Sequence, residues 1–143
     1  GEVVAKGVNS KGNVWSIGIS KPDETAFYES QDIQAIVKLP ERALATSGNY
    51  RNFYEEGGKR YAHTIDPATG YPVQHSLLSA TVLAGDCMTA DALATAFMVL
   101  GLEKSVKLAE TLPGVEVYFI YSDESGFNKI YMSDRFGDYL SEE

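Results

Sequence analysis

The sequence is poor in cysteine and in basic residues, and each shortage excludes a class of protein. Cys87 is the only cysteine among 143 residues, so the chain can form neither an internal disulfide nor a finger-type zinc site. Lys and Arg number 12 against 20 Asp and Glu, which gives a formal net charge of -8. Because nucleic-acid binding depends on clustered basic side chains, this charge argues against a nucleic-acid partner.

Long apolar runs, internal repeats and low-complexity segments are also missing. No stretch approaches the roughly 20 consecutive apolar residues that a membrane-spanning helix needs. The hydrophobic fraction of 44% is ordinary for a globular protein, and 143 residues are enough to bury a sizeable core. We therefore expect one globular unit without a spanning segment of its own.

The hydrophobic pattern has a period of two over most of the chain. Trp15, Ile17 and Ile19 alternate with small or polar residues, as is typical of a half-buried strand. The same reasoning predicts strands over residues 2–8, 14–20, 35–39, 43–46, 50–54, 59–65, 77–84, 115–121 and 128–132. The glycine pair at 57–58 predicts a hairpin turn between two of them.

The period changes near residue 89. Residues 89–100 carry an apolar stripe that predicts a helix with one core-facing side, and Gly101 is placed to end it. A second helix is expected over residues 103–112, and residues 137–143 are expected to fray. The predicted fold class is α+β, with mostly antiparallel strands and two consecutive helices.

Asp91 and Thr95 are the first candidate site residues. They lie four apart on the predicted helix, so their side chains share one face. Both offer oxygen, and Mg²⁺ takes few oxygen ligands from protein, which leaves positions for water and substrate phosphate. The alternative is that Asp91 only complements the helix dipole and Thr95 is a surface hydroxyl. Asp86 is interpreted as a loop or helix-capping residue rather than a further ligand.

Two turns are rich in hydroxyl groups and glycine. In residues 66–70, Pro67 fixes one backbone angle and Gly70 accepts a left-handed one. Such a loop is expected to leave backbone N–H groups free to hold an anion. The alternative is an ordinary tight turn between strands, and the same two interpretations apply to residues 46–49.

His63 and His75 are the only histidines, and a histidine exchanges protons near neutral pH. His63 lies three residues before Asp66, near the mouth of the predicted turn, whereas His75 is interpreted as a surface residue. Aromatic residues gather around the same loops, where they either stack on a planar ligand or pack across strands: Tyr50, Phe53, Tyr54, Tyr61 and Tyr71.

Three segments are more specific than any single residue. Residues 45–51 read ATSGNYR, residues 58–73 read GKRYAHTIDPATGYPV, and SATV at 79–82 precedes TADALATA at 89–96. In this order they resemble the ATSGDYR, GKRYxHIIDPxTGYPV and SVTV…ADALATA segments of the ApbE family of FAD:protein FMN transferases. The resemblance spans nearly the whole chain, is densest over residues 45–101, and implies an ApbE-like (T-fold-like) α+β fold.

The resemblance implies a reaction and its cofactor. Members of this family use Mg²⁺ to cleave FAD, attach FMN to a Thr or Ser of an acceptor protein, and release AMP. Some relatives act as FAD pyrophosphatases, in which water replaces the acceptor hydroxyl. A flavin-binding module without turnover and an inert structural domain are the remaining alternatives.

The resemblance also assigns roles to residues of this sequence. It implies that Asp91 and Thr95 hold Mg²⁺, together with a backbone carbonyl from the family's N-terminal half. His63 is the implied base for the acceptor hydroxyl and contacts the FAD phosphates. Asn49 stands where the family often has Asp, which removes a charge. Contacts to FAD are implied at Ser47, Gly48, Thr69 and Gly70.

Family members are roughly twice as long as this chain. We therefore expect residues 1–143 to be the C-terminal part of a single flavin transferase domain, weakly active or inactive without the N-terminal half. Family members are commonly bacterial lipoproteins on the periplasmic or extracytoplasmic face of the membrane, and Cys87 is internal and cannot carry such a lipid anchor. The implied acceptor is a subunit of a membrane redox complex.

Overall fold

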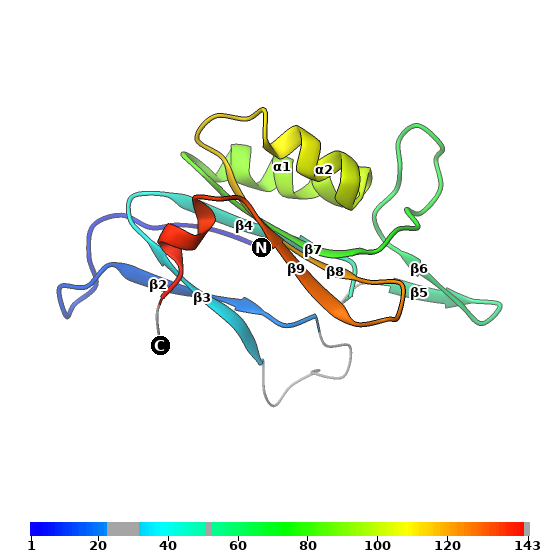
Figure 1. Cartoon of the computed structure of the whole chain (residues 1–143), viewed down its shortest axis with the longest axis horizontal. Coiled ribbons are helices and arrows are strands. Elements are labelled where there is room, and N and C mark those ends of the chain that lie inside the picture. The colour runs from blue at the N-terminus through cyan, green and yellow to red at the C-terminus, as the bar shows by residue number, and fades with distance from the viewer. Residues whose placement is uncertain (23–31, 51–52, 142–143) are drawn as a thin grey trace.

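The computed structural model describes residues 1–22, 32–50 and 53–141, with only the backbone of residues 53–55 and 59–62. Its main sheet is antiparallel, with the strand order β1-β4-β7-β8-β9 (Figure 1). These strands are β1 (Glu2–Val4), β4 (Ala43–Gly48), β7 (Leu77–Ala84), β8 (Glu116–Ser122) and β9 (Asn128–Met132). Two separate hairpins join β2 (Trp15–Ser20) to β3 (Ile33–Leu39) and β5 (Phe53–Glu56) to β6 (Lys59–Ala62).

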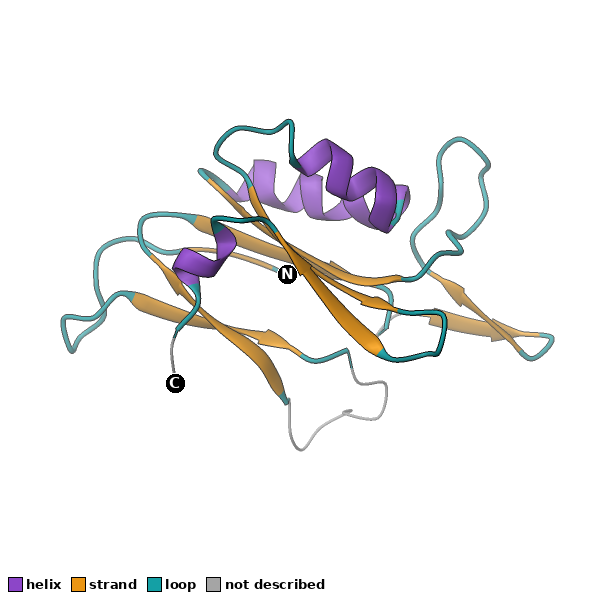
Figure 2. Cartoon of the chain, viewed as in Figure 1, coloured by secondary structure: helices purple, strands orange, loops and turns teal. Residues whose placement is uncertain are grey.

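Both faces of the main sheet are covered. Figure 2 shows the helices on one side of the sheet and the β2–β3 hairpin on the other. These helices are α1 (Cys87–Leu100) and α2 (Leu102–Ala109), whereas the short 3-10 helix η1 (Phe136–Tyr139) packs with the hairpin through Phe136. Along β7, Val82 packs into the core beneath the helices and Leu83 into the core beneath the hairpin. Because consecutive side chains of a strand point to opposite faces, β7 reads as a nearly continuous apolar run.

Helix α1 begins at Cys87, two residues before its predicted start. The Asp86 carboxylate accepts hydrogen bonds from the backbone N–H and the hydroxyl of Thr89, at 2.8 and 2.9 Å. This is the usual chemistry of an N-cap, so the interpretation of Asp86 as a capping residue is confirmed. Gly101 ends the helix with φ +78°, and its N–H donates to the carbonyl of Phe97 at 3.0 Å.

The predicted α+β class and the order of strands and helices are confirmed, but several bounds differ. The strand predicted over residues 59–65 ends at Ala62, and the helix predicted over residues 103–112 ends at Ala109. The first strand stops at Val4 instead of residue 8. The C-terminal residues expected to fray instead form η1, in which Phe136 is fully buried. Arg42 holds this helix, because its Nη1 donates to the Tyr139 hydroxyl at 2.6 Å and its guanidinium lies 5.3 Å from the ring centre. Residues 142–143 lie outside the described part.

The glycine pair predicted to turn the β5–β6 hairpin does so. Gly57 and Gly58 have φ of +59° and +77°, which side chains with a Cβ rarely adopt. This hairpin stands apart from the main sheet in Figure 1. Among the described residues, no helix combines the length and the apolar character that crossing a membrane requires.

Candidate functional site

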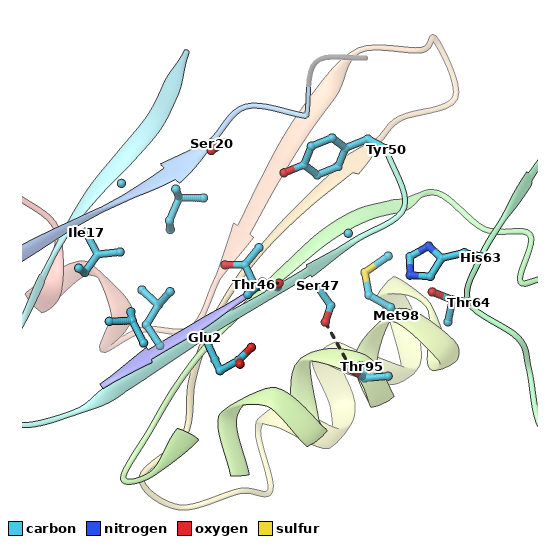
Figure 3. Close-up of a pocket in the computed structure, with 16 residues that line it drawn as sticks. Glu2, Ile17, Ser20, Thr46, Ser47, Tyr50, His63, Thr64, Thr95 and Met98 are labelled. Carbon is cyan, nitrogen blue, oxygen red and sulfur yellow. Dashed lines mark hydrogen bonds between the residues drawn. The ribbon is translucent and has the colours of Figure 1, made fainter. Parts of the chain in front are cut away.

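A cleft of about 590 Å³ opens where β1, the β2–β3 hairpin, the end of β4 and α1 meet (Figure 3). Segments far apart in sequence contribute to it, from the first residues to the last turns of α1. Its polar side chains include Glu2, Thr46, Ser47, Tyr50, His63 and Thr95. The cleft therefore brings together three features that the sequence analysis singled out: the turn at residues 46–49, His63 and Thr95.

Two hydroxyl groups that line the cleft are hydrogen-bonded to each other. Ser47 lies on the side of β4 that faces the helices, two residues beyond Ala45. Thr95 lies on α1, and the two hydroxyl oxygens are 3.4 Å apart (Figure 3). Two predicted site residues, 48 positions apart in the sequence, thus meet at one point.

The described lining of the cleft contains one carboxylate, one imidazole and the amino group of Gly1. Glu2 stands opposite Ala45 in the β1–β4 register and contributes a carboxylate to the lining. None of the described residues that line the cleft is Lys or Arg.

Asp91 lies one helical turn before Thr95 on α1, with an exposed side chain. It is not among the residues that line the cleft, whereas Thr95 is. A carboxylate and a hydroxyl on one helix face make an all-oxygen donor pair that fits Mg²⁺. The described residues include no group of three or more His, Cys, Asp or Glu.

His63 directly follows β6 and lines the cleft with an exposed side chain. Figure 3 places its ring beside Thr64 and Met98. The next residue is held firmly, because the Thr64 hydroxyl donates to Oδ1 of Asn49 at 3.1 Å. Asn49 stands where the family often has Asp, and although it carries no charge, its side-chain oxygen has a defined hydrogen-bond partner.

Gly48 allows the ring of Tyr50 to lie against the end of β4. A Cβ at this glycine would lie 2.6 Å from Cε1 of Tyr50 and 3.1 Å from the carbonyl oxygen of Leu78. Any larger residue would therefore displace the ring from the cleft that it lines. Tyr71 is 74% exposed, and the side chains of Phe53, Tyr54 and Tyr61 lie outside the described part.

The loop at residues 66–70 forms the ordinary tight turn of the two interpretations, and its N–H groups are engaged within the loop. The Asp66 carbonyl accepts from the N–H groups of Thr69 and Gly70, at 3.2 and 2.7 Å. The Asp66 carboxylate accepts from Ala68, and the Thr69 hydroxyl accepts from Tyr71. Neither Thr69 nor Gly70 lines the cleft, and Thr69 instead borders a separate groove with Tyr71.

His75 is not the surface residue that the sequence suggested. Its ring is half-buried, and Nε2 lies 2.6 Å from the carbonyl oxygen of Met98 while Nδ1 accepts from the N–H of Leu77 at 3.2 Å. The ring also packs on Gly101, where an added Cβ would lie 3.2 Å away. His75 therefore fixes the last turn of α1. No local sequence pattern predicts a partner as distant in the sequence as Met98.

Known proteins resemble this chain in sequence and in structure. The family model described as the ApbE family matches residues 1–119. The FAD:protein FMN transferase of Haemophilus influenzae is 46% identical over 127 residues, which cover 89% of this chain and 36% of that protein. The Vibrio cholerae serotype O1 protein of the same name is 43% identical over 141 residues, 99% of this chain and 40% of that protein.

Solved structures agree with the sequence matches. The flavin transferase ApbE from Vibrio cholerae superposes with a TM-score of 0.80 at 40% identity, covering 98% of this chain and 42% of that chain. The apbe protein from Thermotoga maritima gives a TM-score of 0.80 at 32% identity, over 99% of this chain and 43% of that one. The chain thus spans about two fifths of the length of the relatives that it matches.

Proposed function

The chain belongs to the ApbE family, and from that premise we propose that the protein is an FAD:protein FMN transferase. It cleaves FAD with Mg²⁺, transfers FMN to a Thr or Ser of an acceptor protein, and releases AMP. The observation that carries this proposal is the cleft, which His63 and the paired hydroxyls of Ser47 and Thr95 line together. A base and hydroxyl groups in one cleft suit a reaction between a diphosphate and an incoming hydroxyl.

The proposed step is a phosphoryl transfer. The acceptor hydroxyl oxygen forms a bond to the phosphorus on the FMN side of the diphosphate, and the bond from that phosphorus to the bridging oxygen breaks. The bridging oxygen leaves with AMP. His63 takes the hydroxyl proton, a role that its exposed position in the cleft supports, because an acceptor side chain can reach it from solvent.

Asp91 and Thr95 would hold the Mg²⁺ ion. When bound, the ion neutralises charge on the diphosphate and on the departing AMP. The lack of Lys and Arg among the described lining residues supports this need for a cation. The exposed carboxylate of Asp91 remains accessible to a hydrated ion that keeps most of its water.

FAD contacts are proposed in two places. Ser47 and Gly48 line the cleft. Because Gly48 has no side chain, the Tyr50 ring lies against the end of β4, where it would pack on a planar ring of FAD. Thr69 and Gly70 lie outside the cleft with their N–H groups engaged, so a contact there would depend on the Thr69 hydroxyl.

Family membership also supports a proposal about place and partner. We place the full-length protein on the extracytoplasmic face of a bacterial membrane, held by an N-terminal lipid. Its acceptor would be a subunit of a membrane redox complex. Fractionation of cells, with mass analysis of flavin-modified peptides, tests both statements together.

The decisive experiment incubates the full-length protein with FAD, Mg²⁺ and a candidate acceptor domain, then measures the acceptor's intact mass. Two variants each remove one carboxylate from the start of α1. Asp91→Asn is expected to abolish the added FMN mass, whereas Asp86→Asn keeps an N-cap and is expected to retain it.

Other outcomes separate the alternatives. An unmodified acceptor with released AMP would identify an FAD pyrophosphatase. Intact FAD with the wild-type protein, over a panel of acceptors, would leave a flavin-binding module. Equal loss in both variants would show that the start of α1 acts through helix stability instead of through metal binding.

A further inference from the structure

The proposed base follows a strand that is not part of the main sheet. His63 directly follows β6, and β6 pairs with β5 in a separate two-stranded sheet. Ser47 and Thr95 instead lie on β4 and α1, which pack together. Contacts made by the residue directly after His63 therefore contribute to the position of the imidazole relative to these hydroxyls.

Thr64 makes two such contacts through different atoms. Its carbonyl accepts from the N–H of Val73 at 3.0 Å, which closes the intervening loop on itself, as does the bridge between Ile65 and Pro72. Its hydroxyl donates to Oδ1 of Asn49 at 3.1 Å. The second contact is different in kind, because Asn49 directly follows β4 of the main sheet.

Asn49 is itself anchored to the main sheet. Its N–H donates at 3.0 Å to the carbonyl of Leu78. Leu78 is the extra residue of a bulge in β7, since Leu77 pairs with Tyr121 and Ser79 with Ile120. Bulges re-aim groups next to functional sites, and this one presents a carbonyl to the residue after β4. The backbone and the side chain of Asn49 thus connect β7 to the segment that carries His63.

We propose that Asn49 is a positioning residue, whose hydrogen bond to Thr64 sets the place of His63 relative to Ser47 and Thr95. Its effect on turnover rests on the proposed function, but its effect on the imidazole does not. Asn49 and Thr64 are both half-buried, so water competes weakly for their hydrogen bond. Loss of the bond frees the segment after β6 while the main sheet stays intact.

Steady-state kinetics of the full-length protein test this role. Asn49→Ala and Thr64→Val each remove the bond, whereas Thr64→Ser keeps the donor. The two disrupting variants are expected to lower kcat by about 10- to 100-fold, because small misplacements of a catalytic group cost that much. KM for FAD is expected to change by less than about threefold, since the lost interaction acts on the reacting geometry.

The double variant separates positioning from a general structural effect. If Asn49 acts through Thr64, the double variant Asn49→Ala/Thr64→Val loses no more kcat than either single variant. Rescue by Thr64→Ser is expected at the same time. Losses that multiply in the double variant, or a kcat unchanged in both single variants, would overturn the proposal.

A readout without turnover separates this proposal from the proposed function. Diethyl pyrocarbonate modification of His63, followed by peptide mass, is expected to speed up about two- to fivefold in both disrupting variants as the tether is released. His75 is the internal reference, because both of its ring nitrogens are engaged. If the modification rate of His63 rises in the variants while the wild type transfers no FMN, the transferase is rejected and the positioning role stands. If the modification rate is unchanged, the positioning role is rejected whatever the transfer assay gives.

Discussion

Two buried hydroxyl residues on β7 contribute differently to the free energy of unfolding, because only one of them has a hydrogen-bond partner among the described residues. Ser79 and Thr81 are both buried and two positions apart, so they lie on the same face of the strand. Thr81 shares a hydrogen bond with Thr46 at 2.8 Å, whereas the Ser79 hydroxyl has no hydrogen-bond partner among the described residues. A desolvated hydroxyl without a partner costs free energy that the same group with a partner recovers.

Ser79→Ala is therefore expected to leave the free energy of unfolding unchanged or to raise it by about 1 kcal/mol. Thr81→Val leaves the Thr46 hydroxyl without this partner and is expected to lower the free energy of unfolding by about 1–3 kcal/mol. Urea unfolding of both variants gives the comparison. A loss for Ser79→Ala as large as that for Thr81→Val would show that Ser79 has a partner after all.

Among single residues, only some roles were predictable from the sequence. The role of Asp91 and Thr95 as Mg²⁺ ligands stays a prediction, but their shared face on α1 was predictable from helical spacing alone. His75 and Asn49 were not, since their partners lie on other elements, at Met98 and Thr64. Hydrogen bonds between distant segments leave no periodic trace in a sequence.

At the scale of the element, the start of α1 depends on a titrating cap. Hydrogen bonds from the backbone N–H of Thr89, and then from its hydroxyl, hold the pKa of Asp86 below its ordinary value. A lowered folded pKa means that the carboxylate stabilises the fold above its unfolded pKa of about 3.9. This contribution is lost as pH falls through the lowered folded value.

The difference in Tm between wild type and Asp86→Ala is thus expected to be constant above about pH 5 and to shrink toward about pH 2. Asp86→Asn still caps the helix but does not titrate. Its Tm difference from Asp86→Ala is expected to stay flat over the same range. A wild-type advantage that grows on acidification would contradict the assignment of the lowered pKa to this cap.

The junction of the two helices depends on one glycine. Gly101 has φ +78° and ψ 174°, a region that almost only glycine occupies, and its Cα faces the His75 ring. Gly101→Ala is expected to lower the free energy of unfolding by about 1–3 kcal/mol. Gly85→Ala is the matched control, because an added Cβ there meets nothing within 4 Å. Similar losses in urea unfolding of both variants would sink this explanation.

Element types followed from the sequence more securely than loop chemistry. The switch from period two to a helical stripe located α1, and the cap moved its start by only two residues. The loop at 66–70 was predicted as a turn correctly, but its expected free N–H groups are bonded within the loop. Turn residues predict backbone angles, whereas the partners of each N–H depend on how the whole loop closes.

At the scale of the whole molecule, the two-sided burial of the main sheet explains where the cleft lies. The helices cover one face and the β2–β3 hairpin covers the other, so elements from both sides meet at the β1–β4 end of the sheet. Ser47 points to the helix side and Thr46 to the opposite side. A ligand in the cleft therefore contacts both layers at once.

The same architecture predicts a folded chain with an incomplete site. A sheet buried on both faces favours folding of the 143 residues alone, and circular dichroism with cooperative urea unfolding checks this. The chain covers about two fifths of its relatives, and its cleft has no Lys or Arg among the described lining residues. We expect FAD to bind this chain at least about tenfold more weakly than the full-length protein, a loss of about 1.4 kcal/mol or more. Flavin fluorescence titration with and without Mg²⁺ measures the difference, and acceptor mass measures transfer. Robust FMN transfer by the isolated, folded chain would refute this expectation and would place the whole catalytic site within these residues.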